Sequence, residues 1–316
     1  MTTAAPTPVK GISYFFLPPG LEITGLDEKV RIPGGELPLP LLEEDHAAAK
    51  GKLPSYDAIG RGLFHLLRAN PDCAFAGRYV RLLQEGYPHY ISELASQIIM
   101  LDKKEVDVPY LDRKINYLKI FALIEPENPR LPLEIGLAYL AKGLSLSALQ
   151  MTTLSLYRAE EFLRKAQRLD PDDGNARYRL GEVSYLLGKY KEVLDSWGGM
   201  LIRLEGEEAE RMKARLGRIE AGILPRVPAV DYLEAIGVAM SRHQQGETAE
   251  AAAILLDIQD DPVFGEEFPL PEIPYLLGVC SSELGMPRHA EDYFREALRI
   301  DPDFGDARSA LANFSR

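Results

Sequence analysis

Two ten-residue stretches of this chain have nearly the same sequence. They read Arg168-Leu-Asp-Pro-Asp-Asp-Gly-Asn-Ala-Arg177 and Arg299-Ile-Asp-Pro-Asp-Phe-Gly-Asp-Ala-Arg308, and weaker copies occur at residues 70–72, 125–127 and 261–262. Each stretch follows a segment with apolar residues at helical spacing and precedes another such segment. Proline cannot continue the helix before it, while the Asp and Gly beside it suit a helix cap and a tight turn. The stretches therefore predict helix pairs that recur along the chain.

The segment that leads into the second stretch, up to the proline of that stretch, carries further residues at fixed spacing. It contains, in order, Pro274, Leu277, Gly278, Gly285, Ala290, Phe294, Ala297 and Pro302. This pattern resembles the tetratricopeptide repeat, and the residues after Arg177 repeat it with Gly181, Gly188 and Trp197. The resemblance implies an all-α fold, a right-handed α-α superhelix (a TPR-like solenoid) in which stacked pairs share one hydrophobic core.

The same pattern divides most of the chain into predicted segments. We predict TPR-like repeats over residues 129–304, at 129–173, 174–207, 232–265 and 271–304, with an inserted helix at 208–231 and a C-terminal capping helix at 305–316. Residues 52–128 are expected to form degenerate helical repeats. Their candidate helices, separated by prolines, are 55–69, 74–86, 90–104 and 110–125.

Residues 1–51 have a different composition. Residues 12–17, 21–24 and 29–32 are rich in β-branched, aromatic and other apolar residues between Pro and Gly breaks, which favours strands. We expect a short extended or β-hairpin N-terminal arm, followed by a proline-rich strap through Leu42. Because isolated hairpins are marginal in water, the arm should dock on the helices, or alternatively engage a partner.

The bulk properties narrow the class of partner. The formal net charge is −12, so a nucleic acid or an anionic bilayer would be repelled. The most apolar stretch, residues 133–156, is interrupted by Glu134 and Lys142, and this argues against membrane insertion. Two distant cysteines and an N-terminus without a secretory pattern favour the cytoplasm.

Catalytic and metal-binding motifs give only weak candidates. The 5 histidines show no metal-ligand spacing, and no phosphate-binding or nucleophile motif is present. Residues 170–174 resemble a calcium loop, but they lack the continuation that an EF-hand needs. We therefore predict no enzyme activity, no cofactor and no metal.

The candidate binding residues come from the first helix of each pair. In the tetratricopeptide family these helices line the concave face, so the resemblance implies a groove formed by Leu133, Leu137, Tyr178, Glu182, Tyr185, Ile236, Met240 and Tyr275. This set is mostly apolar and aromatic, which suits a protein or peptide partner. The alternative is that the inserted helix or the N-terminal arm buries these residues within the molecule.

Three functions follow from these observations. The first is a scaffold or adaptor that holds a protein or peptide segment in the groove. The second is a structural subunit of a larger secretion or pilus-type assembly, or a homo-oligomer, with the apolar insertion at residues 144–156 as the contact. The third is an enzyme or regulator with a site in residues 1–125, the part that the repeats do not explain.

Overall fold

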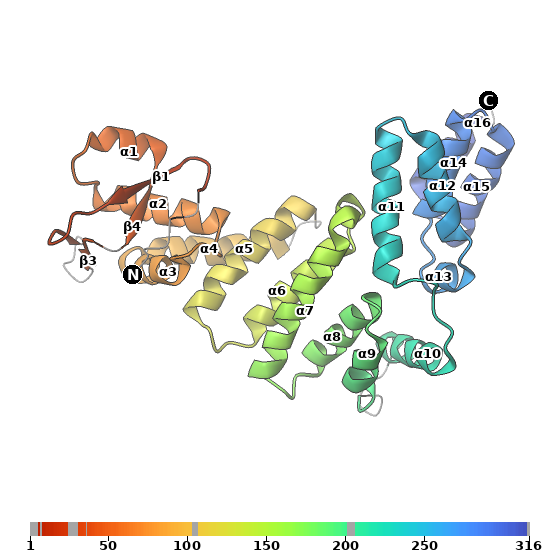
Figure 1. Cartoon of the computed structure of the whole chain (residues 1–316), viewed down its shortest axis with the longest axis horizontal. Coiled ribbons are helices and arrows are strands. Elements are labelled where there is room, and N and C mark those ends of the chain that lie inside the picture. The colour runs from red at the N-terminus through yellow and green to blue at the C-terminus, as the bar shows by residue number, and fades with distance from the viewer. Residues whose placement is uncertain are drawn as a thin grey trace. The chain divides into compact units, whose positions relative to one another are not determined.

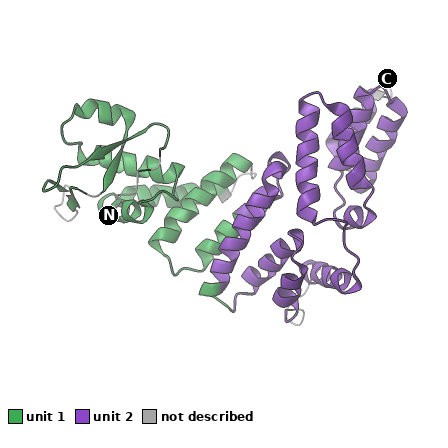
Figure 2. Ribbon diagram, in the orientation of Figure 1, with its two compact units in different colours: residues 1–138, 168–171 green, residues 139–167, 172–316 purple. Residues whose placement is uncertain are grey.

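The computed structural model describes most of the chain, in two compact units. It describes residues 6, 8–24, 31–35, 37–102, 107–200 and 206–314. Unit 1 comprises residues 1–138 and 168–171, and unit 2 comprises residues 139–167 and 172–316 (Figure 2). Parts of the predicted strand at 29–32 and of the predicted repeat at 174–207 lie outside the described residues.

Unit 1 combines four short strands with helices (Figure 1). In chain order these are β1 (Ile12–Phe16), β2 (Glu22–Thr24), β3 (Arg31–Pro33), β4 (Pro38–Leu42), α1 (Glu43–Ala49), α2 (Tyr56–Ala69), α3 (Ala76–Gly86), α4 (Pro88–Asp102), α5 (Val108–Ile124) and the first part of α6 (Arg130–Gly143). Helices α2 to α5 begin and end within two residues of the ranges predicted from the sequence.

The strands form two nested antiparallel pairs. β2 pairs with β3, and β1 pairs with β4 in a register that places Tyr14 opposite Pro40. The segment expected to be a proline-rich strap is therefore a strand. Pro38 and Pro40 are tolerated because this sheet has only two strands, so the missing N–H groups interrupt no central ladder. The alternating Leu39 and Leu41 are fully buried.

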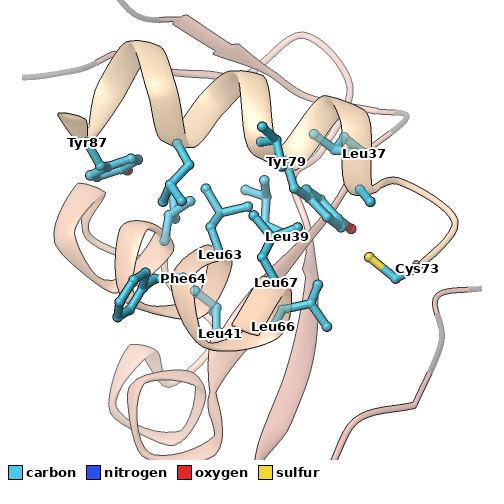
Figure 3. Packing of buried hydrophobic residues seen from close by; sticks show 14 of the residues in the cluster. Leu37, Leu39, Leu41, Leu63, Phe64, Leu66, Leu67, Cys73, Tyr79 and Tyr87 are labelled. Atoms are coloured by element: carbon cyan, nitrogen blue, oxygen red, sulfur yellow. The ribbon is translucent and has the colours of Figure 1, made fainter. Parts of the chain in front are cut away.

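The N-terminal arm docks on the helices of its own unit. Leu39 and Leu41 of β4 belong to a hydrophobic cluster with residues of α2 and α3 (Figure 3). A Cβ on Gly62 of α2 would lie only 1.9 Å from the Pro40 carbonyl oxygen, so this helix needs glycine where the strand approaches it. The Tyr79 hydroxyl of α3 donates to the Pro38 carbonyl oxygen at 2.5 Å. The arm and the helices thus share one core.

Unit 2 is helical in its described residues. It contains the end of α6, the 3-10 helix η1 (Leu146–Met151), α7 (Thr152–Leu169, whose last residues belong to unit 1), α8 (Gly174–Leu186), α9 (Tyr190–Trp197), α10 (Glu207–Ala221), α11 (Ala229–Gln244), α12 (Thr248–Gln259), α13 (Pro262–Glu267), α14 (Glu272–Glu283), α15 (Pro287–Ile300) and α16 (Gly305–Phe314). Helix α10 lies within the predicted insertion except for its first residue, and η1 occupies the apolar insertion between α6 and α7.

Helix pairs of the repeat type form the framework of unit 2. The pairs are α8–α9, α11–α12 and α14–α15, and α16 packs on α15 at the C-terminal end (Figure 1). In two pairs a glycine of the first helix admits a ring of the second. A Cβ on Gly181 would lie 2.0 Å from Trp197 Nε1, and one on Gly278 would lie 2.5 Å from Phe294. The predicted fold class, mostly helical with stacked helix pairs, is confirmed.

Candidate functional site

The predicted groove residues of α8 are covered by other parts of unit 2. Tyr178 and Tyr185 keep only 3% and 1% of their surface exposed. The Tyr178 ring stacks on Trp197 with centroids 5.8 Å apart, and the indole N–H donates to the Tyr178 carbonyl oxygen at 3.0 Å. Met212 and Leu216 of α10 complete the same buried cluster. A partner has no access to either tyrosine while α10 stays in this place.

A buried ion pair fixes α10 over α8. Arg215 Nε donates to Glu267 Oε1 at 2.9 Å, and the Tyr185 hydroxyl donates to Oε2 of the same carboxylate at 2.6 Å. The guanidinium carbon also lies 4.6 Å from the centre of the Tyr185 ring. Burial, together with the hydrogen bond to Glu267, raises the pKa of Tyr185, so the phenol remains a donor. Self-burial was the alternative to groove lining for these tyrosines, and the structure places both inside.

Glu182 is paired within the same region. Its side chain is 12% exposed and accepts from Arg179 Nη1 at 2.9 Å. The other terminal nitrogen of that guanidinium donates to Glu208 of α10, also at 2.9 Å. The charge of Glu182 is therefore neutralised by Arg179 of its own helix, and the same guanidinium links α8 to α10.

The corresponding face of α14 is more open. Tyr275 is half-buried, with ring centroids 5.8 Å from Phe294 and 5.4 Å from Phe304. Val279, one turn further along the helix, is half-buried as well. The helices that α14 mainly packs against are α11, α12 and α15, which all belong to regular pairs. Tyr275 thus keeps part of its ring accessible.

Leu133 and Leu137 lie one turn apart on α6 and are half-buried. Between them, Glu134 Oε2 lies 3.7 Å from Lys114 Nζ of α5. These two leucines belong to unit 1, whereas the other predicted groove residues belong to unit 2.

On α11 the apolar insertion occupies one face. A Cβ on Gly237 would lie 2.7 Å from the Gln150 backbone nitrogen, so glycine is needed where η1 meets the helix. Gln150 Nε2 donates to the Gly237 carbonyl oxygen at 3.1 Å, and the Thr153 N–H donates to Glu234 at 2.8 Å. Leu149 is buried in this contact. The insertion is therefore attached to a helix far from it in sequence.

A groove of about 580 Å³ runs between η1 and the C-terminal half of α11. Its lining consists of uncharged residues: Leu146, Ser147, Ala148, Leu149, Gln150, Met151, Gly237, Met240, Ser241 and Gln244. Leu146 and Met151 are 41% and 50% exposed, and Met240 is half-buried. Ile236, one turn before Met240, is buried. Of the predicted binding residues, Met240 lies in this groove, which we take as the candidate functional site.

Sequence reasoning did not place Leu146, Gln150 and Met151 in a groove. The available signal is the apolar run at residues 144–156, which predicts a contact within a larger assembly or a homo-oligomer. Gln150 meets a partner 87 residues later in the chain, and no local pattern specifies such a pairing.

The described part of the chain offers neither a metal site nor a membrane span. Over the described ranges, no group of three or more His, Cys, Asp or Glu side chains could hold a metal ion. Over those ranges, too, no helix is long and apolar enough to cross a membrane.

Comparison with known proteins adds a family match and several structural likenesses. The tetratricopeptide repeat model matches residues 272–304, which form α14 and α15. No curated protein matches this sequence.

Three of the similar solved structures are described as tetratricopeptide-repeat (TPR) proteins or domains. YrrB, described as a TPR protein with an unusual peptide-binding site, is 21% identical over 61% of this chain and 96% of its own, with a TM-score of 0.27. A TPR protein of Thermus thermophilus, TTC0263, is 18% identical over 59% of this chain and 98% of its own, with a TM-score of 0.24. The P58(IPK) TPR domain is 13% identical over 87% of this chain and 79% of its own, with a TM-score of 0.33.

Proposed function

Since the chain is a tetratricopeptide-repeat protein, with the family match at residues 272–304, we propose that it is a scaffold whose η1–α11 groove binds an extended segment of a partner protein. Tetratricopeptide-repeat proteins generally mediate protein–protein interactions and are usually non-catalytic. The observation that supports the proposal is the groove between η1 and α11, which is open to a ligand. The predicted binding face of α8 is buried and gives a partner no access.

The chemistry of the lining defines the segment. Leu146, Met151 and Met240 offer apolar and polarizable surface, which adapts to varied side chains. The Gln244 amide, and the amide oxygen of Gln150 whose Nε2 donates to Gly237, suit the N–H and C=O groups of an extended backbone. Because the lining carries no charge, a charged side chain buried there would be left without a counter-ion. We therefore expect an uncharged, apolar sequence at the contact.

The size of the groove limits the length of the segment. η1 has 6 residues, which at a rise of about 2 Å each span about 12 Å. An extended peptide rises about 3.3 Å per residue, so about four residues match this length. A cavity of about 580 Å³ also lies within the range of sites for small ligands, which favours a short extended contact over a docked helix.

The test begins with peptides selected from a random library on the full chain, with affinities then measured by isothermal titration calorimetry. Met240→Glu places a charge in the groove and should weaken binding by at least about tenfold, equivalent to about 1.4 kcal/mol. Val238→Glu is the matched control, because Val238 is 40% exposed on the same helix and does not line the groove.

Two results would count against the groove. One is that no selected peptide binds with measurable affinity. The other is that Met240→Glu and Val238→Glu bind the selected peptides as well as the natural chain does. Circular dichroism of both variants verifies that helicity is retained.

A second candidate function rests on the exposed part of the insertion. Leu144, Leu154 and Tyr157 are 43%, 52% and 49% exposed, beside the groove residues Leu146 and Met151. Such a concentration of apolar side chains marks interaction surfaces, and it supports a role as a subunit of a homo-oligomer or a larger assembly. Light scattering tests the homo-oligomer. A monomer at all concentrations contradicts it, whereas Leu154→Glu should dissociate a dimer.

The location proposed for this scaffold is the cytoplasm. Cys73 and Cys280 are both buried free thiols, as is usual in a reducing compartment. Fractionation of cells that express the tagged chain tests this, and recovery in a membrane or secreted fraction would contradict it.

A further inference from the structure

Another pocket lies in unit 1, and its described lining includes none of the predicted groove residues. It has a volume of about 460 Å³ and is lined by Arg68 of α2, Gln97, Met100 and Leu101 of α4, and Tyr110, Arg113 and Tyr117 of α5. The residues from α4 are spaced three and four apart, and those from α5 are spaced similarly. Each helix therefore presents one face to the pocket. Among the residues that the structure describes, two arginines and no acidic residue line it.

The Arg68 guanidinium is held by aromatic groups. Its Nε and Nη2 atoms both donate to the Tyr117 hydroxyl, at 3.0 and 2.8 Å. Its central carbon lies 4.9 Å from the centre of the Phe64 ring and 5.4 Å from that of Tyr117. These contacts fix the cation in position without neutralising it, since a phenol and two rings carry no formal charge.

Arg113 is positioned in a similar way on the other side of the pocket. Its Nε donates to the Pro109 carbonyl oxygen at 3.2 Å, and its central carbon lies 4.6 Å from the centre of the Tyr110 ring. Arg113 and Tyr117 are one helical turn apart on α5, so Arg113 and the tyrosine that holds Arg68 lie on the same face of this helix.

Neither arginine pairs with a carboxylate among the residues that the structure describes, although Arg61, Arg164 and Arg215 each do. Two acidic groups lie one helical turn or one short loop away from the lining, and each is bound to a side chain other than the two arginines. Glu93 accepts from Gln97 Nε2 at 2.7 Å, and Asp72 pairs with Lys119 at 2.6 Å. Within the described ranges, the pocket thus holds two fixed cations without a carboxylate partner, in a chain whose net charge is −12.

We propose that this pocket binds a small amphiphile, whose anionic head, a carboxylate or a phosphate, lies between Arg68 and Arg113. Guanidinium groups bind both heads through paired N–H donors. The apolar chain of the ligand lies against Met100 and Leu101. Met100 is 65% exposed, and a bound chain would cover it. This site does not depend on the peptide groove of unit 2.

The experiment titrates the full chain with single probes by calorimetry at low salt. Octanoate and monooctyl phosphate represent the two heads, and the tighter of the two identifies the preferred one. Octanol, octylamine and inorganic phosphate are the controls for a neutral head, a cationic head and a head without a chain. We expect binding of the octanoate or octyl phosphate probe, weakened by added salt because the attraction is ionic.

The decisive variant is Arg113→Gln, because Arg113 is exposed and its replacement leaves the core intact. It should weaken binding of the preferred probe by about tenfold, the equivalent of about 1.4 kcal/mol. Arg68→Gln should weaken binding as well, with circular dichroism to separate loss of binding from loss of fold. Arg288→Gln, an exposed arginine of unit 2, is the matched control and should bind as the natural chain does.

Four results would overturn the proposal. They are no binding of either amphiphile, equal binding of octanol, equal binding of inorganic phosphate, and unchanged affinity in Arg113→Gln. Equal binding of octanol would show a merely apolar surface, and equal binding of phosphate would show a simple anion site without a place for the chain.

Discussion

The helix pairs α8–α9 and α14–α15 carry the same repeat pattern but leave different faces open. In both pairs a glycine of the first helix admits a ring of the second, Trp197 at Gly181 and Phe294 at Gly278. Yet Tyr178 of α8 is 3% exposed in the cluster that α10 completes, whereas Tyr275, at the same repeat position of α14, is only half-buried. The pattern thus determines packing within a pair, and segments outside the pattern determine which face a partner can reach.

The largest effect should come from breaking the ion pair that fastens α10 over α8. Arg215→Ala leaves the Glu267 carboxylate, whose side chain is 7% exposed, without its cation. Removal of one member of a buried pair costs about 3–5 kcal/mol, because the remaining charge is uncompensated. Urea denaturation followed by circular dichroism measures the loss.

Arg295→Ala in α15 is the control for this prediction. It removes an exposed pair with Glu291 and should cost less than about 0.5 kcal/mol. Adding Glu267→Gln to Arg215→Ala should recover part of the loss, since it removes the stranded charge. If Arg215→Ala and Arg295→Ala lowered the free energy of unfolding by similar amounts, the Arg215–Glu267 ion pair would not be what holds α10 over α8.

An intermediate loss of stability should come from replacing the glycines at the same repeat position of α8 and α14. Gly181→Ala and Gly278→Ala should each destabilise by about 1–3 kcal/mol, because the new Cβ would lie 2.0 Å from Trp197 or 2.5 Å from Phe294. Gly181→Ala should cost more, since the hydrogen bond from Trp197 to Tyr178 resists movement of the indole.

Gly217→Ala on α10 is the control for the glycines. Nothing lies within 4 Å of the position that its new Cβ would take, so alanine should stabilise the helix by about 0.5–1 kcal/mol. Thermal unfolding compares all three variants. If Gly181→Ala and Gly278→Ala were neutral, close packing within the pairs would not be what the repeat pattern specifies.

The smallest expected effect is the change in how the free energy of unfolding depends on pH when a paired glutamate is replaced. Burial alone would raise the pKa of Glu160, but hydrogen bonds from Lys189 and Arg164 outweigh it and hold that pKa below its ordinary value. Stability from Glu160 is therefore complete above the pKa of an unfolded Glu, about 4.3, and is lost as pH falls through the folded pKa.

Glu283 of α14 is another glutamate whose pKa is lowered by hydrogen bonds, and it serves as the comparison for Glu160. Hydrogen bonds from Thr248 and His243 lower its pKa too, but its side chain is 48% exposed and solvent weakens the interaction. Unfolding free energies between pH 6 and 3 should therefore fall less steeply in Glu160→Gln than in Glu283→Gln. The reverse order would mean that the support of α9 by Glu160 is weaker than its burial implies.

Most helices could be predicted because their signals are local. Proline, glycine and apolar spacing give the limits of α2 as 55–69, against the observed Tyr56–Ala69, and they identify α8, α14 and α15. β4 was harder to identify. Its prolines indicated an irregular strap, and only pairing with β1 explains why a strand tolerates them.

The candidate site could be predicted only in small part, because long-range contacts decide it. Spacing placed Tyr178 and Tyr185 on one face of α8, but it could not show that Glu267, 82 residues after Tyr185, would meet its hydroxyl. The contact of η1 with Gly237 could not be predicted either, because the two segments lie 87 residues apart in the sequence. A repeat motif describes two helices, and an insertion is free to settle on any surface that fits it.

Trp197 is the only tryptophan of the chain and lies within the cluster that α10 covers. Its intrinsic emission therefore reports on this cluster alone. Displacement of α10 would admit water to the indole and shift the emission to longer wavelengths, while events at α14 or in unit 1 would leave it unchanged. The molecule thus contains its own optical probe for the opening of the α8 face.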